Sequence, residues 1–324
     1  TAERRFEFFA DRLGLEGVVA PGRFHKIDSE FPYAKRAFLV LADYLEAAPR
    51  GEDLARFKPV LTQELAYLLR LARGRSLCLF TARERMEYAF KGSSEDGIEG
   101  LETAMGRWSI PVFCQERNQS RKALKEEFST RVESVLLGLK SFWEGIDVPG
   151  KSLTFVVMEK LPFPMMGEPL IQARAEEYLT ATSLDRFTPY ILPLMLIQFK
   201  QGFGRLIRRH DDYGVVILYD RGIHRKGYKP DLLASLPGYY RPDTPDRFEA
   251  DRRRTYEEIL RFMRSLETDF DVDADFWDAL PGEGLATGFE ARMRHWTEVF
   301  APLLPLDPNR FDELLPLLLE AMQD

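Results

Sequence analysis

The sequence has no apolar run that approaches the roughly 20 residues a membrane-spanning helix requires, and nothing resembling a secretory signal precedes its first predicted helix. It contains only two cysteines, Cys78 and Cys114, and both lie within apolar, strand-like runs. We therefore expect buried free thiols in a reducing compartment, and neither a disulfide framework nor a metal site. A cytoplasmic protein without membrane contact is predicted. The first residue, Thr1, fits either a processed start or an excised piece of a longer chain.

The chain also lacks the excess of positive charge that is typical of general nucleic-acid binders. Its net charge is −7, but this charge is unevenly distributed. Residues 245–324 contain 19 acidic and nine basic side chains, which is a net charge of −10, so the preceding residues carry +3. This asymmetry favours nucleic-acid contact by the first part of the chain alone.

Five short apolar runs are typical of buried strands, and most are separated by segments with helical periodicity. The runs lie at residues 76–80, 110–115, 134–138, 153–158 and 215–219. Their alternation with helices predicts an α/β fold with a parallel sheet covered on both faces. Amphipathic helices are predicted at residues 2–13 and 61–72, and residues 18–49 are expected to form a strand and loops.

Residues 230–245 are rich in Pro, Gly and Tyr and are interpreted as a linker. We therefore predict a first domain over residues 1–236 and an acidic, mostly helical C-terminal extension over residues 245–324. The helical segments of the extension are predicted at residues 246–266, 289–300 and 311–322. Their many leucines favour packed helices over disorder.

The most informative stretch is residues 201–209, QGFGRLIRR, which follows an apolar helical pattern. On a continued helix, Gln201, Arg205 and Arg208 are spaced i, i+4 and i+7 and project from one face. Two guanidiniums beside an amide form a receptor for phosphate oxygens. Gly204 leaves room for close backbone approach. The alternative is a solvated basic helix end, where the helix dipole favours arginine.

Residues 145–152, GIDVPGKS, fit the phosphate-loop pattern G-x-x-x-x-G-K-[ST]. A working phosphate loop opens into a helix whose N-terminus holds the phosphates. The residues after Ser152 have the pattern of a strand instead, and Pro149 removes a backbone donor. We expect that these residues do not form a phosphate loop. A self-contained phosphate-loop NTPase is the alternative, and it requires a helix that begins near Lys151.

Residues 142–147 follow the run at 134–138, at the end of a strand where open α/β sheets place ligand-binding loops. Here Glu144 and Asp147 could accept hydrogen bonds from ribose hydroxyls or orient the arginine-bearing helix at residues 201–209. An ordinary polar loop is the alternative.

Several segments, in order along residues 2–236, together resemble the DinG/XPD-like superfamily 2 DNA helicases. They are residues 79–81 (LFT, similar to motif IV), 141–150 (SFWEGIDVPG, similar to motif V), 160–164 (KLPFP, similar to the segment after motif V) and 201–208 (similar to motif VI). The sequence departs from motif IV at Ala82 and Arg83, where the family commonly has Ser-Tyr. The extension has no counterpart in this comparison.

The resemblance implies that the chain is the second RecA-like motor domain of such a helicase, with a parallel sheet flanked by helices. It implies that Arg208, the arginine finger, and Arg205 reach the γ-phosphate of ATP, and that Gln201 helps to position the nucleotide. Further nucleotide-binding residues implied are Glu144, Gly145, Asp147 and Gly204. Candidate contacts to single-stranded DNA are Thr81, Arg121, Lys125 and Trp143. The alternatives are a solvated helix face for Arg121 and Lys125, and core packing for Trp143.

Motifs I, Ia, II and III, and the iron–sulfur cluster found in many members, belong to the first motor domain of these helicases, and this sequence has no match to them. The resemblance therefore implies ATP and Mg²⁺ shared with a first motor domain in cis, and an isolated chain that is inactive as an ATPase. The whole protein would be a 5′→3′ DNA helicase associated with the nucleoid. The alternative is a non-motor module that binds single-stranded nucleic acid or a partner protein, with the acidic extension as its docking surface.

Overall fold

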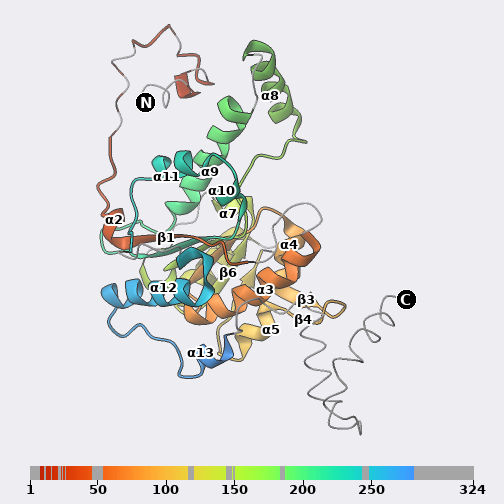
Figure 1. Cartoon of the computed structure of the whole chain (residues 1–324), viewed down its shortest axis with the longest axis vertical. Coiled ribbons are helices and arrows are strands. Elements are labelled where there is room, and N and C mark those ends of the chain that lie inside the picture. The colour runs from red at the N-terminus through yellow and green to blue at the C-terminus, as the bar shows by residue number, and fades with distance from the viewer. Residues whose placement is uncertain are drawn as a thin grey trace.

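A six-stranded parallel sheet forms the centre of the molecule, with helices on both sides (Figure 1). The computed structural model describes residues 8–10, 12–15, 17–20, 23, 25, 27–45, 54–115, 120–143, 148, 150–182, 187–242 and 248–280. The strand order is β1-β8-β7-β2-β6-β5, and every neighbouring pair is parallel. The predicted α/β fold of the RecA-like class, a parallel sheet flanked by helices, is confirmed. None of the helices in the described ranges is both long and apolar enough to cross a membrane.

Five of the six strands of the sheet coincide closely with the predicted apolar runs, and β1 lies within residues 18–49, where a strand was expected without exact bounds. Their bounds are β1 (Ala37–Leu41), β2 (Ser76–Leu79), β5 (Val112–Cys114), β6 (Val135–Gly138), β7 (Phe155–Met158) and β8 (Gly214–Leu218), and a separate hairpin pairs β3 (Gly92–Ser93) with β4 (Ile98–Glu99). Strand β8 begins with a glycine because a Cβ on Gly214, whose φ is 152°, would lie 1.9 Å from the Thr154 carbonyl oxygen.

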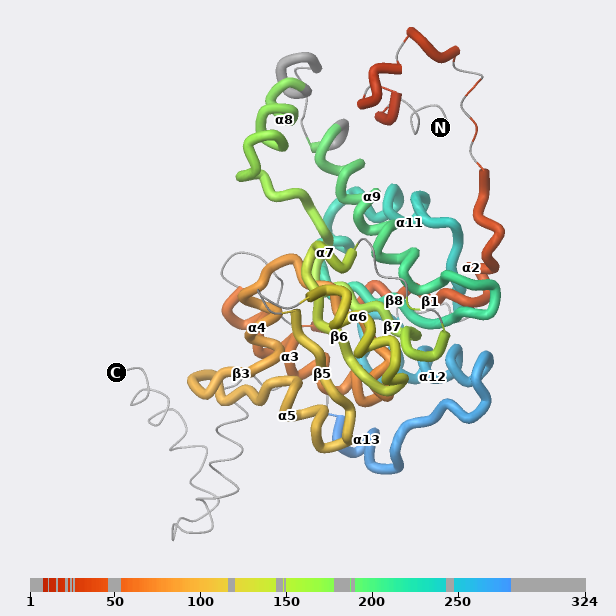
Figure 2. Tube along the Cα trace, turned by 180° about the vertical axis from the view of Figure 1, so that it is seen from behind, coloured from red at the N-terminus to blue at the C-terminus, as the bar shows by residue number. Residues whose placement is uncertain are grey.

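Alternate residues of each strand point to opposite faces and divide the core into two layers. The first face is covered by α3 (Leu54–Leu71), α4 (Arg83–Lys91), α5 (Leu101–Gly106), α12 (Arg252–Leu266) and α13 (Phe276–Ala279). The second is covered by α2 (Tyr33–Arg36), α6 (Arg121–Thr130), α7 (Lys140–Trp143), α9 (Leu192–Phe203), α10 (Gly222–Arg225) and α11 (Lys229–Ser235). The remaining elements are a 3₁₀ turn (Gly150–Ser152), α8 (Pro169–Thr182), a π-helical turn (Phe187–Ile191) and a second 3₁₀ turn (Phe248–Ala250). Figure 2 shows α8 standing away from the sheet, beside α9.

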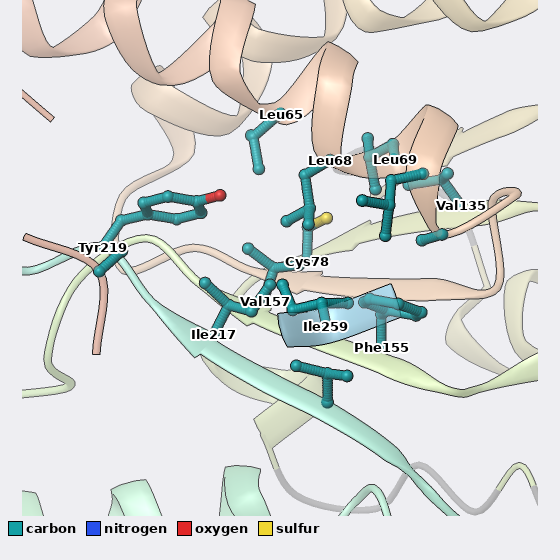
Figure 3. Close-up of a cluster of buried hydrophobic side chains, with 14 of the residues drawn as sticks. Leu65, Leu68, Leu69, Cys78, Val135, Phe155, Val157, Ile217, Tyr219 and Ile259 are labelled. Atoms are coloured by element: carbon teal, nitrogen blue, oxygen red, sulfur yellow. The ribbon is translucent and has the colours of Figure 1, made fainter. Parts of the chain in front are cut away.

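The described part of the C-terminal extension packs on the sheet. Helix α12 buries Ile259 and Met263 in the same layer as α3. Figure 3 shows Leu65 and Leu68 of α3 pointing toward sheet side chains, in the same cluster as Ile259 of α12. The division of the chain into two domains stays a prediction, but residues 248–280 share their core with the sheet.

The interpretation of residues 230–245 as a linker is wrong over its first part. Residues Lys229–Ser235 form α11, and Leu232 is fully buried in the second layer. Farther along, Tyr240 makes a parallel bridge with Phe38 of β1. Leu232 finds apolar partners here, and this burial outweighs the local turn-forming tendency of Pro and Gly. The predicted helices at 2–13, 289–300 and 311–322 fall wholly or mostly outside the described residues.

A buried carboxylate, Glu64 of α3, joins the extension to the ends of two strands. Its side chain is 0% exposed and accepts hydrogen bonds from Tyr44 (2.7 Å), Tyr219 (3.1 Å) and Tyr256 (2.6 Å), while Arg252 forms an ion pair with it at 2.8 Å. Burial, followed by the charge of Glu64, raises the pKa of each of the three tyrosines. The hydroxyls therefore stay protonated as donors, and the buried charge of Glu64 is compensated.

Candidate functional site

The expected arginine helix ends earlier than predicted. Helix α9 stops at Phe203, and Gly204 adopts φ −69° and ψ −4° at its C-cap. Gln201 therefore lies on the last turn, whereas Arg205 and Arg208 lie beyond it in an irregular stretch, residues 204–209, which we call the arginine segment. The prediction that the three side chains share one helix face is wrong. Gly204 weakens the helix, and the side chains of Leu206 and Ile207, which follow it, are buried against the sheet.

A residue that the sequence reasoning did not single out, Asp212, fixes this segment. Its side chain is 5% exposed, and Oδ2 accepts the backbone N–H groups of Arg208 and Arg209, both at 2.8 Å. Oδ1 accepts the N–H of Gly150 at 2.9 Å. Asp212 thus holds the arginine segment to the residues that enter β7. No local sequence pattern pointed to Asp212, because an aspartate commonly accepts from N–H groups that follow it, whereas these precede it by three and four residues.

The arginine segment also contacts the end of α7. Arg205 Nε donates to the Trp143 carbonyl oxygen at 2.8 Å. A Cβ on Gly202 would lie 2.9 Å from the Trp143 ring, so only glycine allows α9 to approach this closely. The Trp143 ring is 1% exposed and belongs to the second core layer. It presents no face on which a base could stack, which corrects the predicted DNA contact: the ring is held in the apolar core beneath α9.

One aromatic side chain, Tyr33, lies near Arg208. Burial raises the pKa of Tyr33, and the positive charge of Arg208 opposes this rise, which places the guanidinium close to the phenol. The Tyr33 ring stacks on Phe203 at a centroid distance of 5.7 Å. Gln201 Oε1 is buried and accepts no hydrogen bond from the described residues. Gln201 and Gly204 thus lie at the end of α9 and Arg205 and Arg208 just beyond it, while Glu144, Gly145 and Asp147 lie outside the described residues.

Thr81 lies elsewhere, at the carboxyl ends of β2 and β7. Its backbone N–H and its hydroxyl both donate to Glu159 Oε1, at 2.8 and 2.7 Å. Arg85 donates through Nε to the other oxygen of Glu159, at 2.8 Å, and Glu159 is 2% exposed. The two donors that were predicted to hold a DNA phosphate are thus engaged by an internal carboxylate. Sequence reasoning missed Arg85 and Glu159, which are separated by 74 residues.

Helix α6 carries the other two candidate DNA contacts. Arg121 is exposed and Lys125 is half-buried, one turn apart, and neither forms an ion pair with a residue that the structure describes. Ser120 caps the helix by accepting from the Ala123 N–H. The C-terminal turn lies at the amino edge of the sheet, where Ser152 Oγ donates to the Ser129 carbonyl oxygen at 3.2 Å. The first turn, with Arg121, therefore points toward the carboxyl edge that also holds Thr81.

The G-x-x-x-x-G-K-S segment does not continue into an α-helix. Gly150–Ser152 form a 3₁₀ turn, and strand β7 follows from Phe155. The predicted strand in place of a helix is confirmed. Lys151 Nζ donates to Glu267 Oε1 at 2.6 Å, at the amino edge of the sheet. Within the described ranges, no group of three or more His, Cys, Asp or Glu side chains is arranged to hold a metal ion.

Residues 65–239 match the family model described as the helicase C-terminal domain. This match covers more than half of the chain, so the chain belongs to the helicase C-terminal domain family, and the resemblance to DinG/XPD-like helicases is confirmed.

The chain is similar to several curated proteins. It is 33% identical over 249 residues to the ATP-dependent helicase DinG of Mycobacterium tuberculosis, covering 77% of this chain and 35% of that protein. It is 32% identical over 233 residues to the ATP-dependent DNA helicase YoaA of Escherichia coli, covering 71% of this chain and 33% of that one. A solved structure titled "Structure of S. tokodaii Xpd4" is 16% identical, with a TM-score of 0.45, over 67% of this chain and 40% of that one. The chain thus spans about a third of the length of these curated relatives.

Proposed function

We propose that this chain is the second motor domain of an ATP-dependent DNA helicase that moves 5′→3′ on single-stranded DNA. Membership of the helicase C-terminal domain family supports the motor assignment. The observation that carries the proposal is that two hydrogen bonds fix the arginine segment. Asp212 accepts from the backbone N–H of Arg208, and the Trp143 carbonyl oxygen accepts from Arg205 Nε. A side chain that stabilises a transition state must be positioned before the reaction begins.

In the proposed mechanism, Arg208 and Arg205 approach the γ-phosphate of ATP bound across the cleft between two motor domains. A guanidinium offers planar donors that match phosphate oxygens and stabilises the negative charge of the transferring phosphoryl group. Gln201, on the last turn of α9, would help to position the nucleotide beside these arginines. The loop with Glu144, Gly145 and Asp147 would couple the nucleotide to the DNA groove.

The residues around Arg208 suit the phosphates of ATP and not the magnesium ion that accompanies them. Guanidiniums repel a divalent cation, which prefers carboxylate and water oxygens. Mg²⁺ and the phosphate-binding loop would therefore come from the first motor domain in cis, as would any iron–sulfur cluster. When bound there, Mg²⁺ would neutralise part of the charge of the phosphates.

The isolated chain is expected to show no ATP hydrolysis, with or without single-stranded DNA. The same chain mixed with the first motor domain of its helicase should hydrolyse ATP, and single-stranded DNA should stimulate the rate. In this mixture Lys151→Ala should retain DNA-stimulated ATP hydrolysis, because Lys151 is paired with Glu267 and serves no phosphate. Turnover by the chain alone that Lys151→Ala abolishes would establish the alternative, a self-contained phosphate-loop NTPase.

Single-stranded DNA is expected to cross the exposed side of α6 near the carboxyl edge. Replacing Arg121 and Lys125 together with alanine should weaken binding of a single-stranded oligonucleotide. It should also reduce the slope of log Kd against log salt concentration by about 1.4, since each phosphate neutralised contributes roughly 0.7. Fluorescence anisotropy at several salt concentrations measures both quantities.

The matched control is Lys122→Ala, on the same helix, where Lys122 lies 3.9 Å from Glu126. It should change the affinity by less than about twofold, because a paired surface lysine contributes little. An equal loss with Lys122→Ala would indicate general charge attraction rather than a defined DNA path.

A further inference from the structure

A second carboxylate, Glu267, lies just beyond α12 and receives donors from three separate parts of the chain. Its side chain is 4% exposed. Arg75 Nη1 donates to it at 2.7 Å, Lys151 Nζ at 2.6 Å and the Tyr213 hydroxyl at 2.6 Å. Burial by itself would raise the pKa of the Glu267 carboxyl, but these hydrogen bonds outweigh it and lower the pKa to about 2. Glu267 is therefore an anion that three donors hold in one position.

Two of the residues that Glu267 binds, Lys151 and Tyr213, are chain neighbours of residues in the network of Asp212. Asp212 accepts from Gly150, which precedes Lys151, and Asp212 itself precedes Tyr213. Two adjacent carboxylates thus tie together the same two segments, 150–151 and 212–213, where the chain enters β7 and β8. The segment at 212–213 is also where the arginine segment ends, through the bonds of Asp212 to Arg208 and Arg209.

The surroundings of Glu267 hold it rigidly. Arg75 stands in the left-handed region, with φ 40°, and its carbonyl oxygen accepts from the N–H groups of Thr154 and Phe155, both at 3.0 Å. Phe270 stacks on Phe155 at a centroid distance of 6.4 Å. A strained backbone of this kind persists only where its surroundings over-determine it. The contacts on both sides of Glu267 therefore anchor the extension to the amino edge of the sheet.

We propose that Glu267 is a positioning residue for the arginine segment. Through its hydrogen bonds to Tyr213 and Lys151, Glu267 fixes the spacing of the two segments that lead into β7 and β8. This spacing allows Asp212 to hold the backbone of Arg208. Glu267 lies outside the matched helicase region, residues 65–239. The extension thereby has a role inside the motor. The effect on ATP hydrolysis rests on the proposed function. The structural link, by which we mean the coupling of Glu267 to the arginine segment through hydrogen bonds, does not.

Amide hydrogen exchange of the whole chain tests the structural link. In Tyr213→Phe, which removes one hydroxyl and leaves the Arg75–Glu267 pair intact, the amides of Gly150, Arg208 and Arg209 should exchange about tenfold faster, since one buried hydrogen bond is lost. Glu267→Gln should give at least the same acceleration. Amides at the centres of β7 and β8 should be unchanged in Tyr213→Phe. Unchanged exchange at the three amides in Tyr213→Phe overturns the proposal, even if Glu267→Gln fails to fold.

The control is Tyr239→Phe, which removes a hydroxyl that bonds only to Arg241 at the surface among the described residues. It should leave all three amides at wild-type rates.

The functional arm uses the chain mixed with its first motor domain. Tyr213→Phe should lower kcat for DNA-stimulated ATP hydrolysis by about tenfold and leave KM for ATP within twofold, because misplacing a positioned group costs rate. Combined with Arg208→Ala it should cause no further loss, which a purely structural role would not predict. A wild-type kcat in Tyr213→Phe overturns the proposal. A wild-type mixture without ATPase activity contradicts the proposed function instead, and the exchange rates still decide the structural link.

Discussion

Arg208→Ala is expected to lower kcat for DNA-stimulated ATP hydrolysis by about 10³-fold or more when the chain is combined with its first motor domain, the range reported for loss of a supplied arginine. The backbone N–H of Arg208 stays bonded to Asp212 in this variant, so the backbone conformation of the arginine segment is kept and only the guanidinium is lost. Single-turnover hydrolysis with saturating ATP measures the chemical step directly. Binding of ATP should change much less than kcat, because the charge that Arg208 stabilises develops in the transition state.

Arg209→Ala is the matched control for this experiment. Its backbone N–H makes the same 2.8 Å bond to Asp212, but its side chain is exposed. We expect kcat within about twofold of the wild type, as for surface substitutions away from a reacting group. If both variants lost activity equally, the effect would come from general positive charge and the positioned arginine would be excluded.

Glu64→Ala is expected to lower the free energy of unfolding by about 3–5 kcal/mol, the usual cost of removing one partner from a buried ion pair. The substitution leaves Arg252 without its carboxylate and removes the acceptor of three tyrosine hydroxyls. Equilibrium unfolding in urea, followed by fluorescence and by circular dichroism, measures the loss. Because Arg252 and Tyr256 belong to α12, the extension should lose protection from proteolysis at lower urea concentrations than in the wild type.

Glu64→Gln separates charge from shape in this network. Glutamine keeps one carbonyl acceptor for the hydroxyls and loses the charge that compensates Arg252, so a smaller loss than for alanine is expected. Glu87→Ala, which removes an exposed glutamate 3.6 Å from Arg83, should change stability by less than about 0.5 kcal/mol. A loss below about 1 kcal/mol for Glu64→Ala would contradict the view that this carboxylate holds the extension on the sheet.

Local patterns predicted the framework of the molecule correctly. The apolar runs at residues 76–80 and 134–138 form β2 and β6, because short continuous apolar runs are typical of parallel strands buried on both faces. The β-branched residues after Ser152 likewise distinguished a strand from the helix that a phosphate loop needs. The order of the segments similar to motifs IV, V and VI was enough to predict the helicase family.

Other features depended on packing that no local pattern contains. The helical spacing of Gln201, Arg205 and Arg208 assumed that α9 continued, but burial of Leu206 and the carboxylate of Asp212 turn the chain after Phe203. Trp143 was a plausible base-stacking residue by its place beside motif V. Its burial follows from the close approach of Gly202, which belongs to another helix.

By itself the sequence determined the α/β class, five of the six strands of the sheet and the helicase family, because each of these depends on the order and period of nearby residues. Only the tertiary structure decided where the arginines stand, that Thr81 is engaged by Glu159, and that residues 248–280 of the acidic extension share the core of the sheet. Each of these depends on a buried carboxylate that meets donors far away in the chain, up to 192 residues for Glu267 and Arg75. A buried charge is tolerated only where folding brings such partners together, and a sequence does not display that distance.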